Sequence, residues 1–246
     1  MTTPRTVWAV DVTTSVISLA RITESTPPSR PLIGAVHPVS VAAHSPYSTW
    51  HHAKSAAKAV VEKIVSGGSP TLVIMAKNVW QNMERDSSAE RRFRLYNAVE
   101  DLLFAAQIPV AEFPYATVAR VLLGHTPRGK DTAIMARLEA AAGELWDIVP
   151  PTKDVNGKAV RVPFRVPVST LAAVGATAVG VPVPGVEVSD AKLQILGGKG
   201  SDLVRANPAI QWPRDLKLPA DLAAWERLRA DPSRLWVKHR DGENAA

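Results

Sequence analysis

Thr6-Val7-Trp8-Ala9-Val10-Asp11 is the stretch of sequence that decides the fold. It is an apolar run that ends in a carboxylate, and Val12-Thr13-Thr14 separates it from a second run, Ser15 to Ile22. Such runs predict two strands joined by a tight turn, and residues 32–42 can supply a third strand. Several folds hold a divalent metal or a phosphate beside a strand that ends in Asp. Asp11 is therefore a candidate functional residue, and a turn-capping role is the alternative.

Helices and strands alternate after this first group. The pattern predicts helices over 48–66, 85–106, 114–123 and 130–146, and strands over 71–75 and 108–113. The run at 71–75 is wholly apolar, which is typical of a strand buried on both faces. The alternation predicts a mixed α/β sheet covered by helices.

The chain changes character beyond residue 150. Asn156-Gly157 lies between two short apolar runs and predicts a β-hairpin within residues 150–163. The other predictions for this part are a small-residue helix over 169–179 with Ser169 as its N-cap, a segment broken by proline and glycine over 181–200, and a last helix over 220–229.

The composition limits the class of protein. Of the 246 residues, 46% are hydrophobic and 21% are charged, which is ordinary for a globular chain. The absence of cysteine excludes disulfides and thiolate metal sites and fits a cytoplasmic protein. No apolar run approaches the ~20 residues that span a bilayer, and the N-terminus lacks the layout of a signal peptide. The net charge of +6 favours anionic partners such as nucleic acid.

Three stretches carry a resemblance to a known family. They are the strand Val7–Asp11, the run Ile108–Pro114 followed by Val118, Leu122, Gly124, Lys130 and Asp131, and the small-residue helix Ala172–Ala178. In this order they resemble the RuvC family of Holliday-junction resolvases, members of the ribonuclease H-like superfamily. The resemblance implies a ribonuclease H-like α/β domain over residues 1–180, whose mixed sheet has a three-strand antiparallel meander plus parallel strands flanked by helices. A C-terminal extension with one helix would follow over 181–246.

Only one of the four acids implied by the resemblance is present. Asp11 matches the first acid, the second falls at Lys77, and the final pair falls at Ser169 and Ala172. Two-metal cleavage needs anionic oxygens that hold two divalent ions ~4 Å apart. Asp11 alone is therefore expected to bind Mg²⁺ weakly or not at all. The resemblance thus implies a degraded acidic centre, in which Lys77 either binds a phosphate or simply faces solvent.

Further aromatic and basic residues are candidates for binding DNA. The resemblance matches Trp80 to an aromatic that the family uses against DNA, and Lys130 to a basic residue near the scissile phosphate. A groove for the phosphate backbone can also be lined by Arg91, Arg92, Arg94 and Arg128. The alternatives are a core position for Trp80 and a merely solvated face for the arginines.

Three functions remain open. The first is a RuvC-like protein that binds branched or duplex DNA, such as the four-way junctions of DNA recombination, with lost or much reduced nuclease activity. The second is an active metal-dependent endonuclease whose acids have moved, with Glu84, Asp86, Glu90, Glu112 and Asp154 as candidates. The third is a structural or interaction protein that keeps the fold without binding DNA. The resemblance also implies a homodimer, or a heterodimer with an active relative.

Overall fold

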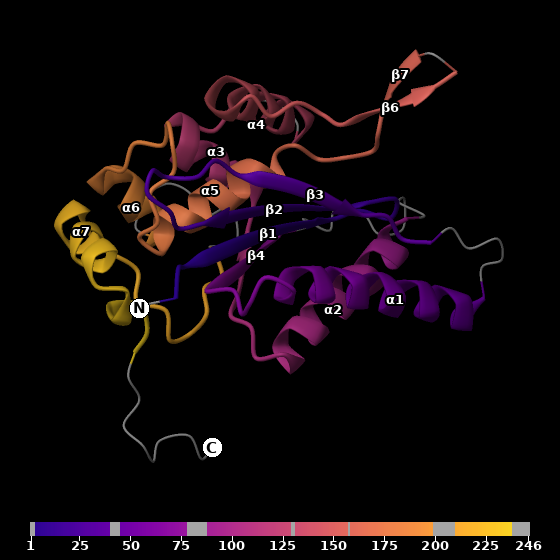
Figure 1. Cartoon of the computed structure of the whole chain (residues 1–246), viewed down its shortest axis with the longest axis horizontal. Coiled ribbons are helices and arrows are strands. Elements are labelled where there is room, and N and C mark those ends of the chain that lie inside the picture. The colour runs from indigo at the N-terminus through magenta and orange to yellow at the C-terminus, as the bar shows by residue number, and fades with distance from the viewer. Residues whose placement is uncertain are drawn as a thin grey trace.

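A five-stranded mixed sheet forms the centre of the protein (Figure 1). The computed structural model describes residues 3–39, 45–77, 88–128, 131–156, 158–198 and 210–237. Strands β1 (Thr6–Val12), β2 (Ile17–Thr23) and β3 (Leu32–Val36) pair antiparallel, and β4 (Leu72–Ala76) and β5 (Val110–Phe113) continue the sheet in parallel from β1. The strand order is β3-β2-β1-β4-β5. This confirms the predicted meander plus parallel strands, although the third strand ends at Val36 and not at residue 42.

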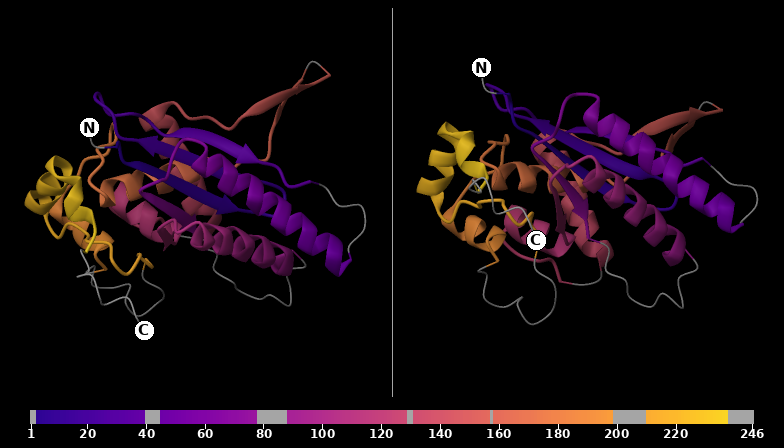
Figure 2. Two further views of the ribbon diagram at one scale, coloured as in Figure 1. Left: turned by 60° about the horizontal axis from the view of Figure 1, so that its bottom comes forward. Right: turned by 90° about the horizontal axis from the view of Figure 1, so that it is seen from below.

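The alternation of side chains along β1 divides the core into two layers. Trp8 and Val10 pack with α1 (Pro46–Val65) and α2 (Ala89–Ala105) on one side of the sheet. Val7 and Ala9 pack on the other side, with α3 (Tyr115–Leu123), α4 (Asp131–Trp146) and α5 (Val168–Ala178), as Figure 1 and Figure 2 show. Asp11 continues the period of Val7 and Ala9. Its side chain therefore lies on the side of α3, α4 and α5.

Helix α5 packs directly on the centre of the sheet. All of its residues are buried, and it contacts β1, β2 and β4. The predicted small-residue helix is confirmed, but its predicted N-cap is wrong. The helix begins at Val168, and the Ser169 hydroxyl donates a hydrogen bond to the Val166 carbonyl at 2.7 Å, whereas an N-cap side chain accepts one from a backbone N–H.

The segments beyond α5 add to the core on the same side of the sheet. They form α6 (Asp190–Leu196), α7 (Leu222–Ala230) and the 3₁₀ helix η1 (Pro232–Leu235), and they contribute Leu193, Leu196, Trp225, Leu228 and Leu235. The last predicted helix corresponds to α7. Helix α6 lies where only proline and glycine breaks were expected, and the Ser189 side chain caps it by accepting from the Lys192 N–H. Among the described helices, none is long and apolar enough to cross a membrane.

A second, two-stranded sheet stands apart from the first. Strands β6 (Thr152–Val155) and β7 (Lys158–Arg161) form the hairpin that Asn156-Gly157 predicts, and the hairpin projects from the body of the molecule (Figure 1). Asn156 has a φ of +54°, the left-handed conformation that a tight hairpin turn requires.

Candidate functional site

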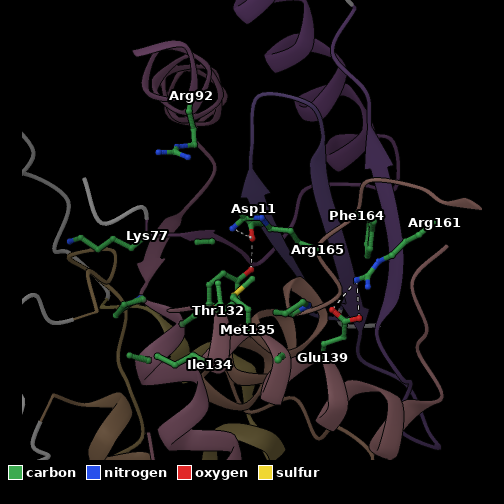
Figure 3. Close-up of a pocket in the computed structure, with 16 residues that line it drawn as sticks. Asp11, Lys77, Arg92, Thr132, Ile134, Met135, Glu139, Arg161, Phe164 and Arg165 are labelled. Carbon is green, nitrogen blue, oxygen red and sulfur yellow. Dashed lines mark hydrogen bonds and ion pairs between the residues drawn. The ribbon is translucent and has the colours of Figure 1, made fainter. Parts of the chain in front are cut away.

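A pocket of ≈ 620 Å³ opens at the carboxyl ends of β1 and β4 (Figure 3). Its charged lining residues are Asp11, Lys77, Arg92, Glu139, Arg161 and Arg165. They come from β1, the end of β4, α2, α4, β7 and the segment before α5. Four of these six side chains are basic and two are acidic, so the pocket offers an electrostatic environment for an anion.

Asp11 lines this pocket with a side chain that is only 1% exposed. The Tyr115 hydroxyl donates a hydrogen bond to Asp11 Oδ2 at 2.7 Å, and Arg165 Nη1 lies 3.6 Å from the same oxygen. Burial raises the pKa of the Asp11 carboxyl above its ordinary value, and this effect outweighs the opposing influence of Arg165, the Tyr115 hydrogen bond and Arg92. The carboxylate is thus held by protein partners at low solvent exposure.

Tyr115 is placed by the end of β5. That strand stops at Phe113, Pro114 follows, and Tyr115 is the first residue of α3, so its side chain starts at the same sheet edge as Asp11. Burial raises the pKa of the Tyr115 hydroxyl well above its ordinary range, and the neighbouring Asp11 charge adds to the shift. The hydroxyl therefore stays protonated and serves Asp11 as a hydrogen-bond donor.

Lys77 follows β4 directly, and its backbone N–H donates to the Phe113 carbonyl at 2.8 Å. In Figure 3 its side chain points away from Asp11. The ammonium lies 3.7 Å from Glu112 Oε2, and the Tyr96 hydroxyl donates a hydrogen bond to the same carboxylate. Glu112, a candidate for a relocated acid, thus belongs to a cluster with Lys77 and Tyr96.

The described residues do not fit the Mg²⁺ that the family resemblance implies. Within the described ranges, no group of three or more His, Asp or Glu side chains could hold a metal ion. Asp11 is bound by Tyr115 and Arg165, and Glu139 pairs with Arg161 at 2.8 Å. Of the other proposed acids, Glu90 pairs with Arg94, Asp154 lies in the projecting hairpin, and Glu84 and Asp86 fall outside the described residues.

The two positions matched to the final acids do not line the pocket. Ser169 and Ala172 are fully buried in α5, and the Ser169 hydroxyl is bonded to Val166. Arg165 and Pro167, just before the helix, line the pocket instead. That the family's acids correspond to Ser169 and Ala172 remains a prediction from the resemblance.

The predicted DNA contacts lie in different places. Arg92 lines the pocket, whereas Arg94 pairs with Glu90 at 2.8 Å and lines a separate hollow of ≈ 200 Å³ between α1 and α2. Arg91 is exposed on α2, and Arg128 is exposed in the turn after α3. Trp80 and Lys130 lie outside the described residues.

Sequence reasoning missed three of the charged lining residues, Glu139, Arg161 and Arg165, and it missed Tyr115, the hydrogen-bond partner of Asp11. Tyr115 had a detectable signal, because it follows a strand that ends at the same sheet edge as β1. Arg161 and Arg165 had no such signal, since only the folded path of the chain from the hairpin into α5 brings Arg165 to Asp11 and Arg161 to the pocket.

Comparison with known proteins returns likenesses of fold. No protein-family model matches the chain, and no curated protein matches its sequence. The RuvC structure from Thermus thermophilus is similar at 15% identity and a TM-score of 0.44, over 68% of this chain and 90% of that one. T. thermophilus RuvC in complex with a Holliday junction substrate gives 13% identity and a TM-score of 0.43 over the same shares, 68% and 90%. The yeast mitochondrial Holliday junction resolvase Ydc2 is similar at 12% identity and a TM-score of 0.38, over 68% of this chain and 74% of that one.

Proposed function

We propose that this protein binds DNA through the basic pocket at the ends of β1 and β4 and does not cut it by a metal-dependent mechanism. One observation carries the proposal. The single carboxylate at the end of the central strand, Asp11, is bound by Tyr115 and Arg165 within a pocket where basic side chains predominate.

The charge of the pocket favours a phosphodiester over a metal ion. Metal-dependent cleavage needs several carboxylates that converge on two cations, and cations already present in a pocket repel a further divalent ion. A phosphodiester carries a negative charge that guanidinium groups bind with two parallel hydrogen bonds. Arg165 is 41% exposed, so its guanidinium can reach a ligand while it remains near Asp11.

Branched DNA is the proposed ligand within this class. The support is the family resemblance of the sequence, which implies four-way junctions and a two-fold assembly that matches their symmetry. A homodimer is the proposed assembly, and a heterodimer with an active relative is compatible with a protein that does not cut.

The test is binding and cleavage of a labelled four-way junction and a matched duplex in Mg²⁺, in Mn²⁺ and in EDTA at equal ionic strength. We expect salt-sensitive binding that survives EDTA, and no cuts under any condition. Arg165→Ala and Arg92→Ala should each weaken binding roughly tenfold, because each removes a charge-assisted contact to phosphate. Arg234→Ala is the matched control, since Arg234 of η1 is 59% exposed, pairs with Asp231 and is not among the residues that line the pocket.

Two results would overturn the proposal. Symmetric cuts that need metal and vanish in Asp11→Asn would identify an active endonuclease whose acids come from elsewhere in the chain. Absence of binding even at low salt would identify an interaction protein that keeps only the fold.

A further inference from the structure

The β6–β7 hairpin is a surface element with little burial of its own. Figure 1 and Figure 2 both show it extending from the body of the molecule. The exposed residues of its two strands and turn are Thr152, Lys153, Asp154, Asn156, Lys158, Val160 and Arg161. An isolated two-stranded hairpin is only marginally stable by itself. The hairpin therefore adds little to the stability of the core, and a role in binding another molecule fits its exposure better.

The strand register gives the hairpin two different faces. Directly opposed residues share a face, and so do residues two apart on one strand. Thr152 lies opposite Arg161, and Arg161 donates to the Glu139 carboxylate of α4 at 2.8 and 3.0 Å. This face is therefore held toward α4.

The opposite face of the hairpin is basic. Lys153 lies opposite Val160, and Lys158 precedes Val160 by two residues on the same strand. All three side chains are exposed, with Val160 at 42%. The one described acid of the hairpin strands, Asp154, alternates with Lys153 and so lies on the Arg161 face. Two ammonium groups thus share a face with no described carboxylate from the hairpin.

The hairpin leads along the chain to the pocket, with Arg161 on the face opposite the two lysines. Strand β7 ends at Arg161, which lines the pocket, and Phe164 and Arg165 line it a few residues later. A strand of four residues spans about 13 Å at the usual rise of a β-strand. Lys158 precedes Arg161 by three residues, so about 10 Å of strand separates their backbones. This length equals about three base pairs of duplex DNA, which rises about 3.4 Å per base pair.

We propose that the β6–β7 hairpin is a DNA-binding arm, in which Lys153 and Lys158 contact the phosphate backbone of the duplex that leaves the pocket. The proposal rests on the proposed function, because the pocket supplies the first contact. The shape of the hairpin suits DNA binding, since a two-stranded β-ribbon fits the major groove of B-DNA. The lysines supply charge without reading bases, so the arm adds affinity and not sequence preference.

The experiment compares Lys153→Gln/Lys158→Gln with the wild-type protein on a four-way junction over a range of salt concentrations. The slope of log K against log salt should become less steep by about two, and affinity should fall roughly tenfold or more. Lys54→Gln/Lys58→Gln on α1 is the matched control, because it removes the same charge from two lysines on another element, whose side chains are 42% and 74% exposed. Lys153→Arg/Lys158→Arg should keep the wild-type slope.

DNA length provides an independent readout. On a duplex too short to extend from the pocket to the arm, the wild-type protein and the Gln variant should bind alike. Equal slopes for the two proteins on long-armed junctions would overturn the arm while the pocket proposal stands, provided that Arg165→Ala still weakens binding. No binding by the wild-type protein would overturn both. An altered oligomeric state with unchanged DNA binding would show that the hairpin contacts a second protein chain instead.

Discussion

At the scale of single residues, the neighbours of Asp11 decide what its carboxylate can do. A strand-end Asp that is open to solvent and to other acids can bind a metal, whereas this one is 1% exposed and bound by Tyr115 and Arg165. Burial dominates its electrostatics and raises its pKa above the ordinary 3.8. The charged form is therefore less stable in the folded protein than in the unfolded chain.

We predict that Asp11→Asn stabilises the protein at neutral pH, because the amide does not carry the buried charge. Because the folded-state pKa is raised, the wild-type protein loses stability as pH rises from the unfolded value near 3.8 through the folded value. The advantage of the variant should be largest above the folded pKa and should vanish toward the unfolded one. Urea unfolding of both proteins between pH 4 and pH 8 measures this difference, and a variant less stable than wild type at pH 7 contradicts it.

Tyr115→Phe should have the opposite effect. It removes the 2.7 Å hydrogen bond to Asp11 and leaves a buried oxygen without its donor, which costs roughly 1–3 kcal/mol. The pKa of Asp11 should rise further. Tyr47→Phe is the control, because Tyr47 is 70% exposed and its change should leave the melting temperature unaltered.

Part of this site could be predicted from the sequence. The period of two along Val7-Trp8-Ala9-Val10-Asp11 places the carboxylate on one face at a strand end, and the end of the next parallel strand places Lys77 at the same edge. The direction of the Lys77 side chain could not be predicted, because it depends on Glu112 of another strand. The contact of Arg165 with Asp11 could not be predicted either, because local sequence does not determine the path of the segment before α5.

At the scale of elements, the contact between α5 and the sheet depends on a missing side chain. A Cβ at Gly175 would lie 1.7 Å from Ile74 Cδ1 and 3.3 Å from Val7 Cγ1, in a fully buried layer. Gly175→Ala should therefore destabilise the protein, because overpacking costs about 1–3 kcal/mol and the better helix propensity of Ala returns only about 1 kcal/mol.

Gly143→Ala provides the matched test of that argument. Gly143 also lies within a helix, but the nearest atom to its added Cβ is the Ile148 carbonyl oxygen at 3.8 Å, an ordinary contact. This variant should keep or gain stability through helix propensity alone. Thermal unfolding of both variants decides the matter, and equal losses at the two positions would contradict the role given to close packing.

The elements themselves were predicted with uneven success, for physical reasons. Long periodic segments such as α1 and short apolar runs such as β4 carry clear signals. Helix α6 spans only Asp190–Leu196, so it shows less than two turns of periodicity between residues that favour turns. On α2, Phe93 lies three residues before Tyr96, a spacing that favours one buried face. Phe93 is nevertheless 41% exposed, whereas Tyr96, Leu95 and Ala98 are buried. Because α2 has apolar residues on several sides, its sequence alone does not determine which face is buried, and tertiary packing decides it.

At the scale of the whole molecule, one buried cation just before β1 joins the start of the sheet to helix α7. Arg5 is 4% exposed and pairs with Glu24, while its Nη1 donates to the Val179 carbonyl at 2.9 Å and to the Leu228 carbonyl at 3.1 Å. The Trp225 indole N–H donates to the Thr177 carbonyl at 2.8 Å beside it. These bonds tie α7 to the sheet and to the end of α5. The division into a 1–180 domain and a 181–246 extension stays a prediction that can be tested at this point.

Arg5→Ala should lower the free energy of unfolding by roughly 3 kcal/mol, at the low end for a broken buried ion pair because Glu24 is 28% exposed. Arg229→Ala is the control, since Arg229 is 52% exposed on α7. If residues 210–237 unfold together with the sheet, tryptophan fluorescence and far-ultraviolet circular dichroism should give coincident transitions in the wild-type protein and in Arg5→Ala.

Separate transitions in the variant alone would mean that Arg5 couples two units able to unfold independently. Separate transitions in both proteins would mean that the extension is a domain of its own, and that its bonds to Arg5 add little cooperativity.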